Sequence, residues 1–528
     1  MKDRNSSLII LRERKTVEIE PEPITRKLYL RLTEPALTDN RADVDRLRQE
    51  LQKIVGDVKI DVSFMNSIAG VLRKSGWKVT ATVGFYDYSW KLIGLEEGDT
   101  TERHYGLAVD IGTTTVVAYL VDMKNGDVID VEAEYNGQIK YGEDILTRIF
   151  NAGDDKGLNL LQRAVIDSLN NLIRKLEEKS GIIAEREISA VSVGANTTMV
   201  HLFLGLSPAN ICVAPYIPVV NSPGTVEAGY LGLGVNPGAP VYIFPSVGSY
   251  LGGDIIAGVL SCEMNKREEL ALLVDIGTNG EIVMGNSQWM VACAGAAGPA
   301  LEGGVAASGM RAEAGAVYKI SIGQNSGRVE YFTIGDRDPV GICGSGLVDG
   351  IAELFLAGII DRSGRFRDGR DHFVVVPSEK SGTGRDIVIS QVDINNFMRT
   401  KGAVNAAMEL LLESVGCDLK DIERFYAAGA FGHHLDIESS VNLGLYPDLP
   451  RDKMVRVGNS SGEGARMALM SVNCLKEAEE IAKNITYFEL NANQDFMNKF
   501  VSSKFIPHTN MDYYPTVKKR LSDRGLLK

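Results

Sequence analysis

The sequence predicts an α/β protein in which two related lobes follow a small α/β domain. An apolar run that ends in Asp-Ile-Gly-Thr occurs at residues 107–113 and again at residues 272–278. Each copy is followed by a second apolar run, which is the pattern of a strand, a tight turn and a returning strand. The copies lie far apart in the chain, so they indicate a duplicated fold rather than two unrelated turns.

The composition bounds the class of protein. A chain of 528 residues exceeds one hydrophobic core, so two or three domains are expected. A formal net charge of −13 argues against a nucleic-acid partner and against an anionic membrane surface. The sequence shows no apolar run of about 18 uncharged residues and no apolar signal segment at its start. We therefore expect a cytoplasmic protein without a membrane partner.

The beginning of the chain reads as an arm and a small domain. Residues 1–24 are charged and contain Pro-Glu-Pro at 21–23, which favours an extended linker. Residues 25–102 alternate strand-like and helix-like segments, with helical spacing at 43–55. Nothing in this small α/β domain resembles an active site, so we interpret it as a spacer or docking module.

The two lobes are expected within residues 103–528, at about 103–268 and 269–528. The first begins with a β-meander, continues through an amphipathic helix at residues 158–178, and reaches a buried strand at residues 188–193. The second restarts the strand–turn–strand pattern at Ala271. In such folds a ligand binds at the carboxyl ends of the strands.

The two turns form the predicted phosphate-binding site. Glycine lets backbone N–H groups approach phosphate oxygens, and threonine hydroxyls add donors. The candidate binding residues are Gly112, Thr113, Thr114 and Thr115 in the first turn, and Gly277, Thr278, Asn279 and Gly280 in the second.

Acidic residues beside the turns are the candidate catalytic groups. Asp110 and Asp275 are expected to hold Mg²⁺, which prefers carboxylates and keeps several waters, and to organise the attacking water. Glu281 is expected to assist. An aspartate at a strand end also accepts N–H bonds within its own turn, so a purely structural role stays open for either aspartate.

Three further glycine-rich loops follow. Gly344, Ser345 and Gly346 begin a helical pattern, which exposes N–H groups to an anion or allows close packing on a strand. Gly429, Ala430 and Gly432 follow an apolar strand and would let an adenine or ribose lie against bare backbone. Residues 458–465 precede an Ala/Met-rich helix. The Walker pattern is missing from the sequence, so this is not a P-loop protein.

In this order, residues 110–115, 275–281 and 429–432 resemble the first phosphate, second phosphate and adenosine motifs of the actin, sugar-kinase and heat-shock-chaperone superfamily. More narrowly, four segments resemble the ATP-dependent reductive activators of corrinoid proteins: 141–149, 193–199, 341–349 and 505–509. The resemblance covers roughly residues 25–528. It implies a duplicated, actin-like ATPase with two ribonuclease H-like lobes.

The resemblance also implies a function. ATP bound and hydrolysed in the cleft between the lobes is expected to drive reduction of a corrinoid from Co(II) to Co(I). The implied partners are a corrinoid iron–sulfur or corrinoid methyl-carrier protein, a reduced ferredoxin-type donor and a second copy of the chain. The six cysteines show no C-x-x-C spacing. A [2Fe–2S] cluster is therefore expected only in a missing domain or a partner.

Three alternatives remain open at the level of sequence. A small-molecule kinase of the same superfamily would transfer phosphate to an acceptor. An activator of 2-hydroxyacyl-CoA dehydratases would share a [4Fe–4S] cluster between subunits, with Cys343 as a candidate ligand. A nucleotide-gated binding module, or a filament-forming actin relative, would show no corrinoid-stimulated ATP turnover.

Overall fold

The computed structural model describes residues 16–277, 280–295, 306–323, 328–490 and 494–527. These residues divide into two compact units. The first unit holds residues 16–261 and 460–483, and the second holds residues 262–459 and 484–527. A segment from late in the chain therefore completes the first unit. Within the described ranges, no helix combines the length and the apolar composition needed to cross a bilayer.

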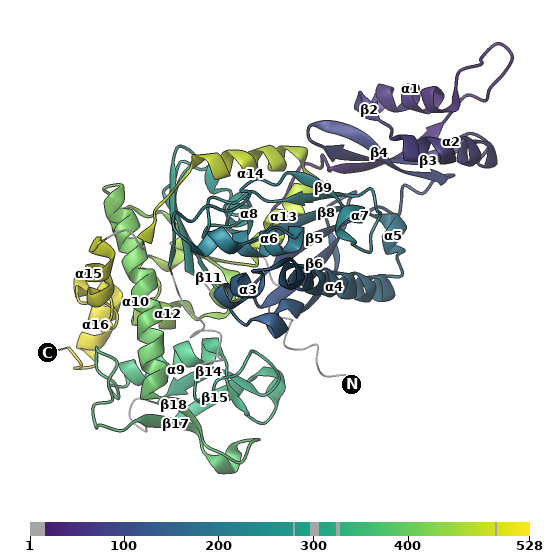
Figure 1. Cartoon of the computed structure of the whole chain (residues 1–528). Helices are drawn as coiled ribbons and strands as arrows, with labels where there is room; N and C mark the ends of the chain where they lie inside the picture. Colours follow the sequence, from purple (N-terminus) through teal and green to yellow (C-terminus); the bar gives the residue numbers. More distant parts are fainter. Residues whose placement is uncertain (1–15, 278–279, 296–305, 324–327, 491–493, 528) are drawn as a thin grey trace. The chain divides into compact units, whose positions relative to one another are not determined.

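A small α/β domain begins the first unit (Figure 1). Its four strands lie in the order β1-β3-β4-β2. Helix α1 buries Leu47 and Leu51, and α2 buries Ile68 and Leu72, because residues at this spacing share one face of a helix. The elements are β1 (Thr25–Arg31), α1 (Asp43–Val55), β2 (Val58–Lys59), α2 (Val62–Lys74), β3 (Lys78–Tyr86) and β4 (Ser89–Glu97).

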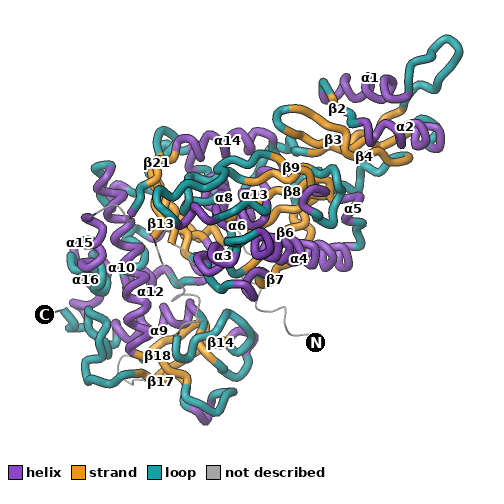
Figure 2. The backbone as a smooth tube through the Cα atoms, in the orientation of Figure 1, coloured by secondary structure: helices purple, strands orange, loops and turns teal. Residues whose placement is uncertain are grey.

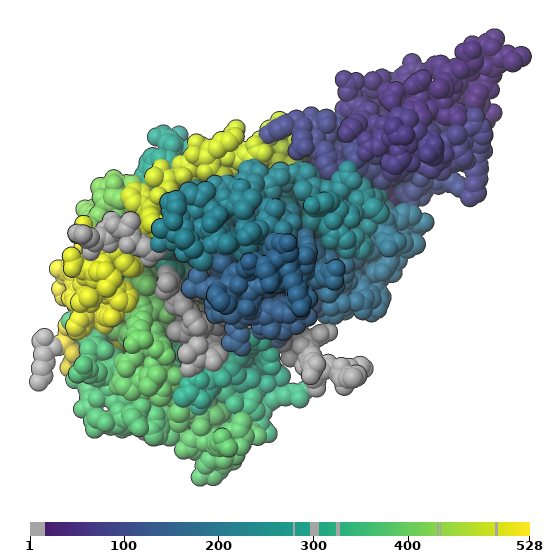
Figure 3. All heavy atoms as spheres, viewed as in Figure 1, coloured from purple at the N-terminus to yellow at the C-terminus, as the bar shows by residue number. Residues whose placement is uncertain are grey.

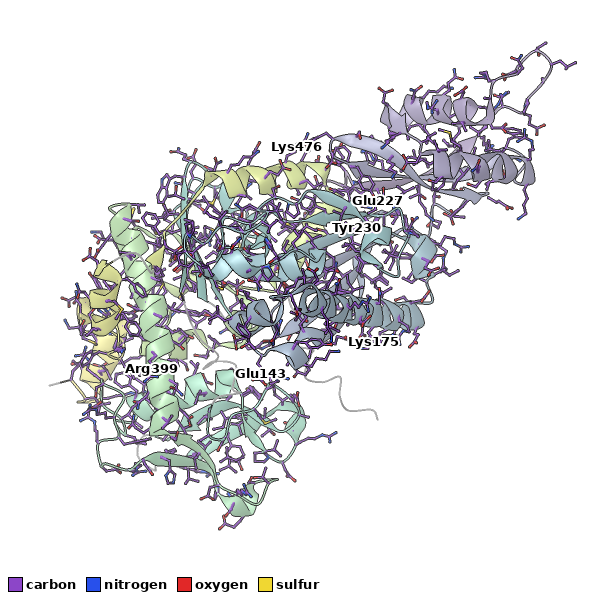
Figure 4. All side chains as sticks on the ribbon, in the orientation of Figure 1. Glu143, Lys175, Glu227, Tyr230, Arg399 and Lys476 are labelled. Carbon is purple, nitrogen blue, oxygen red and sulfur yellow. The ribbon has the colours of Figure 1, made fainter. Side chains whose placement is uncertain are left out.

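Polar contacts join this domain to the remainder of the first unit. The hydroxyl group of Tyr86 donates to the carbonyl of Gly238 at 2.8 Å. Lys91 pairs with Glu227 at 2.5 Å, and Figure 4 labels Glu227 beside Tyr230 on the neighbouring short helix. The small domain is thus tied to the edge of the following sheet.

That sheet has six strands in the order β7-β6-β5-β8-β10-β9. Strands β7, β6 and β5 form the expected antiparallel meander, and β8 and β10 continue parallel to β5. The strands are β5 (Tyr105–Ile111), β6 (Thr115–Asp122), β7 (Val128–Tyr135), β8 (Ile188–Ala195), β9 (Thr225–Glu227) and β10 (Pro240–Ile243). The helices are α3 (Ile145–Asn151), α4 (Asp155–Ser180), α5 (Ala184–Glu187), α6 (Thr197–Leu204), α7 (Ala228–Leu231) and α8 (Gly253–Ser261).

Side chains of β5 alternate between two helical layers. Leu107, Val109 and Ile111 belong to the hydrophobic core that α4 completes. On the other face, a Cβ at Gly106 would lie 3.0 Å from Leu469 of α13 (Ser460–Met470). Asp110 shares this second face, which fixes the layer toward which its carboxylate points.

Two helices return from late in the chain to complete the first unit. They are α13 and α14 (Val472–Asn484), and Figure 3 shows residues of α14, in yellow-green, on the surface of this unit. Helix α13 is almost wholly buried. A Cβ at Gly464 would lie 2.2 Å from the carbonyl oxygen of Ala257, so glycine lets α13 pack backbone-to-backbone on α8.

The second unit contains another six-stranded sheet, in the order β20-β19-β11-β12-β13-β21. Figure 2 labels two of its strands, β13 and β21. Strands β11, β12 and β13 form an antiparallel meander, and β19 and β20 run parallel to β11. The strands are β11 (Ala271–Ile276), β12 (Gly280–Gly285), β13 (Met290–Gly295), β19 (Arg424–Ala428), β20 (Met454–Gly458) and β21 (Ile485–Tyr487). The order β13-β12-β11-β19-β20 repeats β7-β6-β5-β8-β10, which confirms the predicted duplication.

The remainder of the second unit is inserted around this sheet. Two smaller sheets hold β14 (Ala316–Ile322), β15 (Val329–Thr333), β16 (Gly341–Ile342), β17 (His372–Val376) and β18 (Ile387–Ser390). The helices are α9 (Gly344–Leu356), α10 (Gln391–Ser414), α11 (Gly429–His434), α12 (Ile437–Leu443), α15 (Gln494–Ser502) and α16 (Pro515–Asp523).

A buried lysine fastens the long helix α10 to the segment that follows α15. The ammonium group of Lys401 donates to the carbonyls of Ser503, Phe505 and Pro507. Burial lowers the pKa of Lys401 to about 7, and the three carbonyls use all three of its donors. These three hydrogen bonds hold the backbone of residues 503–507 against α10, so we assign Lys401 a structural role.

Candidate functional site

The first turn is tight, and its geometry requires glycine. Asp110 is the second-last residue of β5 and lies opposite Gly194 of β8. The N–H of Gly112 donates to the carbonyl of Thr115 at 2.9 Å. A Cβ at Gly112 would lie 2.8 Å from that same oxygen. The turn therefore holds the three threonines 113–115 next to Asp110.

Two asparagines support this turn from neighbouring elements. Asn136 donates through Nδ2 to the carbonyl of Gly112 at 2.9 Å. Asn196 donates through Nδ2 to Thr113 Oγ1 at 3.2 Å, and its Oδ1 accepts from the N–H of Met199 at 3.0 Å. Asn196 thus caps α6 and also contacts the turn.

Asp254 is a member of this cluster that the sequence reasoning missed. It lies in the first turn of α8. Burial is the main cause that raises the pKa of Asp254 to about 7, and the charge of Asp110 raises it further. Two carboxylates that repel each other at close range are typical of sites that share a proton or a cation. The Gly-Gly-Asp sequence at residues 252–254, after an apolar strand, was the available signal.

Ser461 is the second missed member. Its hydroxyl donates to Asp110 Oδ1 at 2.9 Å. A Cβ at Gly194 would lie 2.4 Å from Ser461 Oγ, so glycine at this position of β8 admits the serine. Residues 458–465 stood out as a glycine-rich segment, and this contact assigns the segment a place beside Asp110.

The asparagine substitution of Asp254 should stabilise the protein while impairing the site. Because its folded-state pKa is raised, the folded protein binds the extra proton and loses stability as pH rises from about 4 to about 7. Asp254→Asn removes that penalty, so we expect the free energy of unfolding to rise by about 1 kcal/mol or more at pH 8. At pH 5 the gain should be less than half as large. Urea unfolding at both pH values measures it.

The exposed Asp127 supplies the control for this measurement. Asp127→Asn should change the free energy of unfolding by a similar small amount at both pH values. An Asp254→Asn variant that is destabilised to the same extent at pH 5 and pH 8 would show that the carboxylate of Asp254 is not held against Asp110.

The second turn places two more carboxylates together. Asp275 of β11 lies directly opposite Glu281 of β12 in the antiparallel register. Side chains of directly opposed residues share one face of a sheet, where like charges destabilise each other unless a proton or cation intervenes. Glu281 is buried. The arrangement is chemically suited to a cation beside a phosphate group.

Helix α11 begins against Asp275. Gly429 adopts a φ of +82°, and a Cβ there would lie 2.3 Å from Asp275 Oδ1. A Cβ at Gly432 would lie 3.0 Å from the carbonyl carbon of Ala427. Both glycines therefore bring bare backbone close to the end of the central strands. This part of the predicted adenosine motif adjoins the predicted second phosphate motif within the second unit.

The loop before α9 has a different explanation. A Cβ at Gly346 would lie 2.2 Å from the carbonyl oxygen of Val317, so close packing on β14 accounts for the glycine. This was the structural alternative left open above. Cys343 is buried, and its sulfur lies 3.3 Å from Ser345 Oγ. Helix α9 contacts α11, and Gly344, Ser345 and Gly346 stay predicted binding residues.

The remaining predicted site residues divide as follows. Asp110 and residues 112–115 lie together in the first unit, whereas Asp275, Gly277, Gly280, Glu281, Gly429 and Gly432 belong to the second. Thr278 and Asn279 lie outside the described residues, as does the side chain of Ala430.

Among the residues that the structure describes, no three His, Cys, Asp or Glu side chains form a metal-binding group. Hydrated Mg²⁺ needs only one or two carboxylates, so the carboxylate of Asp110 is sufficient to hold it.

Three family models together match most of the chain. Residues 14–102 match the RACo linker region, residues 105–267 match the RACo middle region, and residues 269–518 match the C-terminal domain of RACo, the ASKHA domain. A curated relative, the corrinoid activation enzyme RamQ of Eubacterium limosum, is 32% identical over 416 residues, covering 75% of this chain and 69% of the relative. The chain belongs to the RACo family.

Other comparisons agree with membership of the RACo family. A solved structure of a reductive activator for a corrinoid, iron–sulfur protein is 40% identical, with a TM-score of 0.87, and the match covers 95% of this chain and 82% of that one. A Co(II) methylated-amine-specific corrinoid protein reductase of Methanosarcina barkeri is 24% identical, over 72% of this chain and 73% of the relative. These findings confirm the predicted family and the actin-like, duplicated α/β fold.

Proposed function

We propose that this chain of the RACo family uses ATP to drive the one-electron reduction of a corrinoid protein. The relatives support the part of the proposal that concerns corrinoid reduction, since two are named for corrinoid activation or corrinoid reduction. The ATP half rests mainly on one observation, the carboxylates of Asp110 and Asp254 beside the glycine-threonine turn. Such a cluster would combine hydrogen-bond donors for phosphate oxygens with carboxylates that can hold a cation and a proton.

Each residue of the first turn has a proposed task. The N–H groups and hydroxyls of residues 112–115 bind phosphate oxygens. Asp110, positioned by the hydroxyl of Ser461, binds hydrated Mg²⁺, which neutralises phosphate charge when bound. Asp254 accepts a proton from the attacking water, because a carboxylate with a pKa near neutrality is an effective general base at physiological pH.

The second turn is also proposed to bind nucleotide. Asp275 and Glu281 face one another across the hairpin and would share a cation or its waters. Gly277, Thr278, Asn279 and Gly280 would bind phosphate, and Gly429, Ala430 and Gly432 would line the adenosine. Gly344, Ser345 and Gly346 are proposed to contribute donors from the start of α9.

The overall reaction balances in electrons and atoms. One electron from a reduced ferredoxin-type donor converts Co(II) to Co(I), while ATP and water give ADP and phosphate. The proposed partners are therefore a corrinoid iron–sulfur or methyl-carrier protein and the donor, and the chain is proposed to act as a cytoplasmic homodimer. Its own residues bind nucleotide and change conformation, and the iron–sulfur chemistry belongs to the donor.

Corrinoid carrier protein should stimulate ATP turnover. With Mg-ATP, a low-potential donor and a Co(II) carrier, we expect phosphate release to rise several-fold and Co(I) to appear by absorbance. Because ATP drives an uphill step, Co(I) formation should stop when ATP is omitted. Equal Co(I) formation without ATP would contradict the proposal. Phosphate transferred to an added small-molecule acceptor would instead indicate a kinase.

The burial of Cys343 argues against the activator of 2-hydroxyacyl-CoA dehydratases. A cluster shared between two subunits needs thiolates at a surface that the two copies can share. The side chain of Cys343 is 2% exposed and its thiol donates to the carbonyl of Val317 at 3.4 Å. Iron analysis of the purified protein tests this alternative directly.

A further inference from the structure

The arm at residues 16–24 lies against the helices that return to the first unit. The N–H of Glu22 donates to the carbonyl of Met470 at 2.8 Å, and the N–H of Ile24 donates to that of Leu469 at 3.0 Å. The carbonyl of Glu22 accepts from the N–H of Val472 at 2.9 Å. These bonds attach the arm to the end of α13 and the start of α14.

A buried ion pair within α13 extends this attachment. Glu463 and Arg466 are 1% and 3% exposed, and they contact each other at 2.7 Å. Glu463 Oε1 accepts from the N–H of Val17 at 2.7 Å, and Arg466 Nη2 donates to the carbonyl of Val17 at 2.5 Å. Both charges of the pair thus use the backbone of a single residue of the arm. A buried ion pair needs such additional hydrogen bonds to offset its desolvation.

Arg466 has a third attachment that limits its movement. Its Nη1 donates to the carbonyl of Gly126 in the turn between β6 and β7 at 3.1 Å. Gly126 adopts a φ of +79°, and a Cβ there would lie 2.9 Å from the same Nη1. The guanidinium group is therefore enclosed by the turn, and it cannot follow the arm without breaking contacts.

The same helix contacts the candidate nucleotide site. Ser461, which donates to Asp110, precedes Glu463 by two residues. A Cβ at Gly462 would lie 2.5 Å from the ring of Tyr119. Gly464 packs equally closely on α8, the helix that carries Asp254. Because packed interiors deform little, a shift at one end of α13 displaces the other.

We infer that the arm, residues 16–24, is energetically coupled to the Asp110 site through α13. The inference rests on the proposed binding of Mg-ATP at that site. A cation held by Asp110 fixes the carboxylate that accepts the hydrogen bond from Ser461 and so orders the first turn of α13. The Glu463 and Arg466 pair carries this change to Val17. By linkage, docking of the arm changes nucleotide affinity by the same factor as nucleotide changes docking of the arm.

Proline at position 17 tests one direction of this coupling. Val17→Pro removes the N–H group that donates a hydrogen bond to Glu463. The substitution changes neither residue of the ion pair and none of the site residues. We expect the Kd of a non-hydrolysable Mg-ATP analogue, measured by calorimetry, to rise by about 5-fold or more. Glu20→Pro is the matched control. Glu20 is exposed, and within the described part of the chain its N–H makes no hydrogen bond that the substitution would remove.

Hydrogen exchange of the unaltered protein tests the other direction. The amides of Val17, Glu22 and Ile24 should exchange more slowly when the analogue is bound, because a better-ordered α13 holds the arm more tightly. A parent protein that binds no nucleotide would overturn the proposed function itself. A parent that binds nucleotide, with an unchanged Kd for Val17→Pro and unchanged exchange in the arm, would overturn the coupling alone.

Discussion

Replacing Asp110 with asparagine is expected to lower ATP turnover about 100-fold or more. Asparagine keeps the size of the side chain, and its Oδ1 can still accept from Ser461. The substitution therefore removes mainly the negative charge that would hold the cation against the phosphates. Steady-state phosphate release at saturating Mg-ATP measures the effect.

Asp127→Asn is the control for loss of one negative charge from the same antiparallel meander, since Asp127 is exposed in the turn between β6 and β7. It should leave turnover within about twofold of the parent value. Thermal unfolding of Asp110→Asn should resemble that of the parent or lie slightly above it, because the substitution relieves the repulsion from Asp254. Turnover of Asp110→Asn close to that of the parent would contradict the assignment of Asp110.

The second large effect is expected from Gly429→Ala. The added Cβ would lie 2.3 Å from Asp275 Oδ1 and 3.0 Å from the carbonyl oxygen of Ile276. Either Asp275 or the start of α11 must move, and both belong to the proposed site. Displacement of a reacting group by about 1 Å can lower activity 100-fold. We expect a loss of turnover on that order, measured in the same assay.

Gly416→Ala provides a matched control for this substitution. Its φ of +69° is similarly unfavourable for alanine, but a Cβ there would meet nothing within 4 Å. Both variants should therefore lose about 1 kcal/mol of stability from the left-handed backbone, whereas only Gly429→Ala should lose turnover. Equal turnover in the two variants would show that Gly429 does not support the site.

Local sequence patterns predicted the strands and helices well where one pattern was uninterrupted. Strong periodicity gave the helix at residues 43–55 with the bounds observed for α1, and the helix at residues 158–178 lies within α4. The two Asp-Ile-Gly-Thr turns predicted both hairpins, because the tight turn and the flanking strands depend on neighbouring residues. The predicted duplication followed from these hairpins and is confirmed by the strand orders.

Contacts between distant segments could not be predicted in the same way. Ser461 reaches Asp110 across a separation of 351 residues, and no local pattern indicates which strand a returning helix covers. Asp254 was missed because a glycine pair before a helix usually marks only a turn. The proposed role of Asp254 depends on its neighbour Asp110. Because side chains alternate along β5, Asp110 lies on the face of the sheet that α13 covers. The candidate turns were thus predictable, and their supporting groups required the fold.

The return of α13 and α14 has a consequence for biosynthesis. The first unit needs residues 460–483 to cover the face of its sheet that carries Gly106 and Asp110. A ribosome must therefore translate past residue 483 before this hydrophobic face can be covered by its own helices. Until then the emerging polypeptide exposes an apolar surface, and molecular chaperones are the expected means of shielding it.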